Sequence, residues 1–257
     1  RLTVSFSLIA VFFVVEAVGG VLTNSLALIS DAGHMLTDVV GLGMALAAIQ
    51  LATRHEHRAH AGQHTFGLYR LEILAAFVNA LLLVGVAGFV IVEAVRRIGE
   101  EPEVLGGPML VVAGLGLAVN LVAFALLREG AGESLNVEGA YLEVVADTVG
   151  SVGVIVAGVL LQVFGWTWVD PLVAAAIGLW ILPRPWRLGG QAVRILLQAA
   201  PPGVDLEALL GDLAALEGVV DVHDLHVWTL TSEMENASAH LVVDVGTDTH
   251  GVLDQAR

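Results

Sequence analysis

The chain has 257 residues, of which 56% are hydrophobic and 14% are charged, and its mean hydropathy is +0.82. Soluble domains carry about 25% charged residues, so this composition excludes an ordinary soluble domain and predicts a membrane protein. The formal net charge of −15 excludes a basic nucleic-acid-binding surface. The absence of cysteine excludes disulfides and thiolate metal ligands.

Six apolar stretches each approach the length of about 20 residues that a helix needs to cross the hydrocarbon core of a bilayer. They cover residues 2–21, 26–51, 73–95, 104–127, 141–164 and 169–188. The predicted fold class is therefore an α-helical polytopic membrane protein with six transmembrane helices. The pair Asp170-Pro171 is typical of a helix start, so Asp170 is predicted to cap the sixth helix.

The arginines predict an orientation for these helices. If six helices alternate across the membrane, Arg96 and Arg97 fall on one side. The opposite side receives Arg1, Arg54, Arg58, Arg70, Arg128, Arg184, Arg187 and Arg194. By the positive-inside rule, both termini and the loops after the second and fourth helices are predicted to be cytoplasmic, in a multi-pass protein of the cell membrane.

The pattern changes to that of a soluble domain after Pro185. Leucines at 206, 209, 210, 213 and 216 form one apolar face of a helix that is expected to start near Asp205. Two stretches with the alternation of strands follow, 219–232 and 237–245, and the chain ends as a further helix begins. We therefore expect a transmembrane domain at 1–189 and a truncated α+β cytoplasmic domain at 190–257.

Three ionisable residues, Asp31, His34 and Asp38, interrupt the second apolar stretch. Residues four apart lie one above the other on a helix, so His34 and Asp38 share a face, and the fifth stretch repeats this spacing with Glu143 and Asp147. Each such residue costs roughly 2.5–3.5 kcal/mol at a helix centre, which marks a functional site. Four side chains from two helices match tetrahedral zinc, with Asp31 as an accessory ligand.

Two other interpretations of these residues stay open at this point. Buried polar groups also join helices by hydrogen bonds, a role that Asn120 and Ser151 fit. Acids that line a cleft can also relay protons without any metal. The two i,i+4 pairs on separate helices favour a metal site over both.

Four motifs together resemble the cation diffusion facilitator family of zinc transporters: SLALISDAGHMLTD, HTFGLYRLEILAAFVNA, ADTVGSVGVI and VHDLHVWTLTS. The resemblance covers nearly the whole chain in order. It implies a homodimer that exports divalent metal from the cytoplasm in exchange for protons, with a ferredoxin-like cytoplasmic domain that binds metal. The family's transport-site pairs fall on His34 with Asp38 and on Glu143 with Asp147.

The fifth-helix pair departs from the commonest pattern, because Glu143 stands where many zinc members have histidine. Zinc remains the first expectation for the transported metal, and no organic cofactor is expected. Oxygen ligands also favour harder ions, so exporters of Mn²⁺, Fe²⁺, Co²⁺, Ni²⁺ or Cd²⁺ are alternatives. Two alternatives belong to other classes of protein: a membrane-anchored metal sensor and an intramembrane metallohydrolase. The His-Glu-x-x-His signature of many metallohydrolases is absent from the sequence.

Histidines outside the apolar stretches form two groups. Residues 55, 57, 60 and 64 lie in the loop after the second helix, where weak metal binding and plain exposure are equally expected. In the tail, His223 and His240 fall on adjacent predicted strands and are expected to converge as ligands of a cytoplasmic metal site. His226 shares a strand face with Trp228, which favours packing for that residue.

Overall fold

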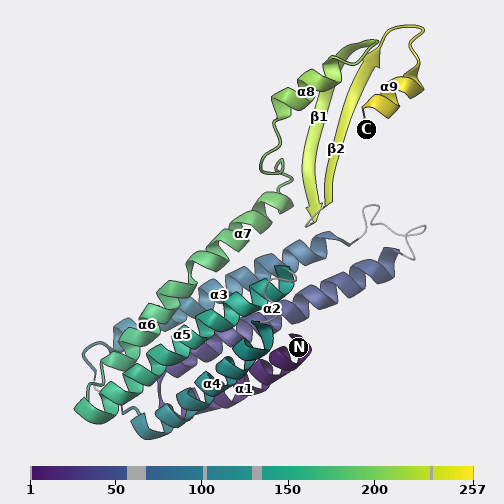
Figure 1. The fold of residues 1–257 in the computed structure, drawn as a ribbon. Helices are drawn as coiled ribbons and strands as arrows, with labels where there is room; N and C mark the ends of the chain where they lie inside the picture. The colour runs from purple at the N-terminus through teal and green to yellow at the C-terminus, as the bar shows by residue number, and fades with distance from the viewer. Residues whose placement is uncertain (1, 57–67, 101–102, 129–134, 232–233, 257) are drawn as a thin grey trace. The chain divides into compact units, whose positions relative to one another are not determined.

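The computed structural model describes residues 2–56, 68–100, 103–128, 135–231 and 234–256 (Figure 1). The chain divides into two compact units, which are treated separately below. The first comprises Arg1–Gly43 with Val78–Leu188, and the second comprises Met44–Phe77 with Gly189–Arg257.

A helix is present in each of the six predicted apolar stretches. They are α1 (Leu2–Thr23), α2 (Leu26–Glu56), α3 (Arg70–Arg97), α4 (Gly106–Leu127), α5 (Leu135–Phe164) and α6 (Val169–Ile181). Within the described part of the chain, three segments are long and apolar enough to cross a membrane: α3, α4 and Val144–Phe164 of α5. The helical membrane domain predicted from the sequence is thus confirmed.

The last predicted apolar stretch is divided at Leu182. Helix α6 has 13 residues, which span about 20 Å, and α7 (Pro183–Leu196) follows after one residue. Pro183 and Pro185 have no amide hydrogen, so the regular hydrogen-bond ladder is interrupted at this point. The predicted stretch continued to residue 188, so the sequence analysis did not locate this break, although Arg184 lies between the two prolines.

Small residues allow the helices of the first unit to approach closely. A Cβ atom at Gly33 of α2 would lie 2.6 Å from Val86 Cγ1 of α3, and one at Gly158 of α5 would lie 2.8 Å from Leu110 Cδ2 of α4. Close approach through glycine is typical of helix pairs in membranes. Asn120 adds a buried polar link between α4 and α5, because its Nδ2 donates to Ser151 Oγ at 3.1 Å.

The largest apolar core of the first unit lies at the end of the bundle that holds the α1–α2, α3–α4 and α5–α6 connections. It takes residues from the first two to three turns of α2, α4 and α6 and from the last two to three turns of α3 and α5. Its buried members are Leu26, Ala27, Leu28, Val90, Ala94, Met109, Ala113, Val154, Ala157, Leu161, Val169 and Ala174. This end of the bundle is therefore tightly packed; it is called the outer end below, after the orientation that the arginine distribution predicts.

The second unit contains the cytoplasmic domain predicted from the tail. Its elements after α7 are α8 (Leu206–Ala214), β1 (Val219–Thr231), β2 (Met234–Val243) and α9 (Thr249–Gln255), and the two strands pair antiparallel. Helix α8 begins where the sequence predicts, because the Asp205 side chain accepts hydrogen bonds from the amides of Glu207 at 3.0 Å and Ala208 at 3.1 Å.

Candidate metal site between the membrane helices

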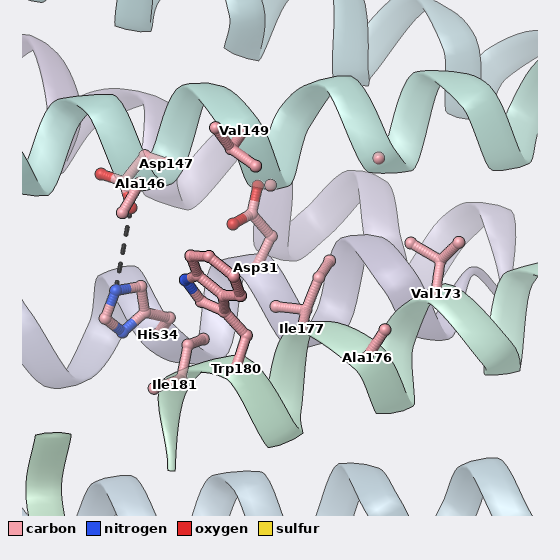
Figure 2. Close-up of a pocket in the computed structure, with 12 residues that line it drawn as sticks. Asp31, His34, Ala146, Asp147, Val149, Val173, Ala176, Ile177, Trp180 and Ile181 are labelled. Atoms are coloured by element: carbon pink, nitrogen blue, oxygen red, sulfur yellow. Dashed lines mark ion pairs between the residues drawn. The ribbon is translucent and has the colours of Figure 1, made fainter. Parts of the chain in front are cut away.

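The predicted ligands of α2 and α5 that are described come together around one imidazole ring. The Nε2 atom of His34 lies 3.6 Å from Oδ2 of Asp38, one turn further along α2, and 3.7 Å from Oδ1 of Asp147 on α5. Figure 2 shows His34 facing Asp147 across the gap between the two helices. The side chains of His34 and Asp147 are 8% and 6% exposed, so this contact is buried inside the bundle.

The spacing of these atoms suits a metal ion. Two ligand atoms bound to tetrahedral zinc at 2.0–2.2 Å lie about 3.4 Å from each other. The two measured separations are a few tenths of an ångström longer, so a small inward shift of either carboxylate would place it and the imidazole in coordinating positions. One imidazole nitrogen and carboxylate oxygens are donors that zinc accepts.

The fourth predicted ligand, Glu143, lies within α5, but its side chain is outside the described part of the structure. Its position in the helix is four residues before Asp147, which places the two residues on one face, a turn apart. Its part in the site therefore remains a prediction.

A cavity of about 240 Å³ extends from His34 and Asp147 along the α5–α6 interface. Figure 2 shows Val173, Ile177 and Trp180 of α6 forming one wall, with the site residues of α2 and α5 opposite. The volume accommodates an ion that keeps several waters. Most of the lining is apolar, and such surroundings strengthen the electrostatic attraction between a cation and the acids.

Asp31 lines the same cavity and is joined there by an acid that sequence reasoning did not place at the site. Glu16 of α1 is 1% exposed, and its carboxyl group lies beside that of Asp31, which is 4% exposed. The available sequence signal was that Glu16 is the sole charged residue of α1. Two buried acids from α1 and α2 therefore lie together at the edge of the site.

A second group of ligand-type side chains lies on the cytoplasmic sheet. His223 and His240 are register partners, and their ring centroids are 5.2 Å apart. Asp224 completes the group: its Oδ2 lies 3.2 Å from Nδ1 of His223 and 3.5 Å from Nδ1 of His240. The three ligand atoms all lie within 4.8 Å of one another, and the side chains are exposed. They form a candidate peripheral metal site.

Asp224 reaches both rings because the strand is irregular at this residue. The register shifts between His223 and His226, and Asp224 adopts a left-handed conformation with φ of 54°. A bulge bends a strand and re-aims its side chains, and aspartate tolerates this region better than most residues. Sequence reasoning missed Asp224 because regular alternation places it on the face opposite His223.

The third histidine on these two strands, His226, is not part of this group. His226 pairs with Ser238, beyond the register shift. The loop histidines His57, His60 and His64 lie outside the described residues, as does the side chain of His55. The sequence prediction for that loop is therefore untested.

Replacing His223 with alanine in the full chain is expected to lower zinc affinity at the tail site at least about tenfold, because one of its three ligands is lost. Equilibrium dialysis in an Asp147→Asn background, which weakens the membrane site, measures this change. His226→Ala is the matched control on the same strand and should bind zinc normally. Equal affinity in both variants would rule out the His223–Asp224–His240 site.

A cavity in a helical membrane domain, lined in part by two carboxylates and an imidazole, suits a protein that moves cations. Comparison with known families agrees: residues 2–197 match the cation efflux transmembrane domain, and residues 201–257 match the cytoplasmic domain of cation efflux proteins. The chain belongs to the cation diffusion facilitator family, whose members are transporters and not enzymes. It is therefore a membrane-embedded metal efflux protein with a cytoplasmic domain.

Relatives that are named for different metals are similar to this chain. The metal cation efflux system protein CzcD of Cupriavidus metallidurans is 47% identical over 247 residues, covering 96% of this chain and 77% of the relative. The cadmium, cobalt and zinc/H(+)-K(+) antiporter of Bacillus subtilis is 40% identical and covers 95% and 78%. The zinc transporter ZitB of Escherichia coli is 40% identical and covers 99% and 80%.

Proposed function

We propose that this chain exports divalent metal cations, zinc foremost, from the cytoplasm in exchange for protons. The observation that carries the proposal is the convergence of Asp38 and Asp147, from two helices, on one imidazole nitrogen of His34 inside the membrane domain. Relatives named as a zinc transporter and as an antiporter of cadmium, cobalt and zinc support both the metal and the exchange.

Competition between metal and protons explains the exchange physically. Imidazole and carboxylate bind a metal only when they are deprotonated, so metal binding releases protons and protonation expels metal. Several acids close together titrate as a coupled group. If the site opens alternately to the two sides, protons that enter from outside drive the bound metal outward.

The arrangement in the membrane follows from the same proposal. Both termini and the tail face the cytoplasm, as the arginine distribution predicts, and the protein resides in the cell membrane. The tail from residue 190 onward acts as a dimerisation and metal-binding domain, while residues 1–189 transport the ion. A second copy of the chain completes the working homodimer.

Flux measurements in liposomes test this proposal. With the tail facing outward, the lumen corresponds to the outside of the cell, so an acidic lumen should accelerate zinc entry. We expect the rate to fall when a protonophore dissipates the gradient and to fall further when the gradient is reversed. A rate of zinc entry that does not depend on the gradient would refute proton exchange. If zinc, cobalt, cadmium and manganese all failed to enter, transport itself would be refuted.

A further inference from the structure

The first turn of α2 obtains its hydrogen-bond acceptors from another helix. The amides at the start of any helix have no partner within it. Here the amide of Leu26 donates to Asp170 Oδ2 at 2.7 Å, that of Ala27 donates to Asp170 Oδ1 at 3.3 Å, and that of Leu28 donates to Ser25 Oγ at 3.2 Å. Asp170 belongs to α6, so it caps a helix more than 140 residues away in sequence.

This arrangement corrects the expectation that Asp170 caps its own helix. The N-cap residue of α6 is Trp168, which makes no side-chain capping hydrogen bond, and Asp170 lies inside the first turn of α6. Ser25 Oγ also donates to Asp170 Oδ1, at 2.6 Å, and the carboxylate is fully buried. The carboxylate therefore accepts from Ser25, directly before α2, and from the first two amides of α2.

Asp170 is too far from the candidate transport site to be one of its ligands. Its partner Ser25 precedes His34 by nine residues, which corresponds to about 13 Å along α2. The carboxylate faces the backbone of the first turn, whereas His34 faces Asp147 two to three turns further along. Any effect of Asp170 on transport must act through the position of α2.

Arg97 of α3 holds the same turn from another direction. Its Nη1 donates to the Asn24 carbonyl oxygen at 2.9 Å, its Nη2 donates to Asn24 Oδ1 at 3.2 Å, and its Nε lies 3.2 Å from Glu93 Oε1. Asn24 has a left-handed φ of 55°, which gives the α1–α2 turn its tight shape. We call Asn24, Ser25, Arg97 and Asp170 the outer clasp.

The residues that the clasp holds are also the ones that block the outer end. Leu26, Ala27 and Leu28 are at most 1% exposed and pack in the apolar core with Val169 and Ala174 of α6. The cavity beside His34 reaches Val173 on α6, but neither Val169 nor Leu26 lines it. Among the described residues, an ion in the cavity therefore meets a packed apolar core toward the outer end.

We infer that Asp170 is a positioning residue of the transport cycle: it binds the first turn of α2 to α6, closes the outer end above the site, and must release α2 before the ion leaves there. This inference rests on the proposed export function. Weakening the clasp should raise the population that is open at the outer end. It should also lower the apparent affinity for zinc on the cytoplasmic side, because fewer molecules are then competent to bind it.

The absence of cysteine in the chain allows a direct test. Val173→Cys places a reporter thiol on the cavity wall, one turn from Asp170. A membrane-impermeant maleimide is added outside intact cells, and the rate at which it labels this thiol is measured. The rate should rise about tenfold when Asp170→Ala is added, because the loss of a helix cap shifts an equilibrium by about this factor. Zinc flux should show a raised KM. Asp170→Asn keeps one oxygen acceptor, so both effects should be smaller.

Asp205→Ala is the matched control, because Asp205 also caps a helix but binds only its own α8; labelling should not change. Unchanged labelling with Asp170→Ala would overturn the inference, as would a normal KM. If Asp170→Ala does not reach the membrane, Ser25→Ala removes one donor of the clasp and decides the question by the same labelling. A failure of the proposed export function would appear as absent zinc flux in the chain without the Asp170 substitution. Because labelling needs no metal, that outcome is distinguishable from a failure of the inference about Asp170.

Discussion

Replacing Asp147 with asparagine should reduce zinc flux at least about 100-fold, which is the largest effect that we expect from a single substitution. The change keeps the size of the side chain but removes the negative charge beside His34 Nε2, 3.7 Å away. A neutral amide is a poor zinc ligand, and the loss of one metal ligand exceeds the 10- to 100-fold typical of its supporting partners. Initial zinc uptake into liposomes measures the effect.

Two comparisons make the Asp147→Asn result specific. Asp212→Asn replaces an exposed acid of α8 and should leave the flux unchanged. Zinc binding by the His223–Asp224–His240 group should survive Asp147→Asn, because that group lies in the other compact unit. Flux above half of the original value in Asp147→Asn would exclude Asp147 as a ligand of the transported ion.

Replacing Glu143 with histidine should change which metal is preferred, raising the ratio of zinc to manganese flux about tenfold. Imidazole suits zinc, whereas carboxylate oxygen suits harder ions such as manganese. With histidine at 143, each helix offers one imidazole and one carboxylate at i,i+4 spacing. Parallel flux assays with zinc, manganese, cobalt and cadmium give the selectivity directly.

Glu143→Asp is the control for the selectivity experiment, because it keeps an oxygen donor and should leave the ratio close to the original. Glu235→His adds an imidazole on the exposed part of β2 and should also leave the ratio unchanged. A ratio that is the same for Glu143→His and Glu143→Asp would show that this side chain does not contact the transported ion.

Sequence reasoning located the features that depend on short stretches of the chain. The six apolar stretches, the cap of α8 at Asp205 and the two strands of the tail each follow from residues within a few positions of one another. The i,i+4 pair of His34 and Asp38 belongs to this class too, because the helix itself sets the geometry. The approach of Asp147 to His34 needed one further assumption, that α2 and α5 are neighbours.

The features that sequence reasoning missed depend on which elements are neighbours in space. Glu16 became part of the site because α1 places it against Asp31, and hydropathy contains no such information. Asp170 satisfies the local pattern of an N-cap, yet its carboxylate accepts from Ser25 and from two amides of α2. Asp224 depends on a strand irregularity that a simple alternation of residues does not reveal.

At Asp224 the β1–β2 hairpin needs a side chain for metal binding in a backbone conformation that favours glycine. A residue other than glycine in this region costs of order 1 kcal/mol, and glycine would relieve that cost. Glycine, however, has no carboxylate to offer to the two imidazoles. Asp224→Gly should therefore raise the thermal stability of the hairpin and lower the metal affinity of the His223–Asp224–His240 group. At this position a gain in one property is a loss in the other.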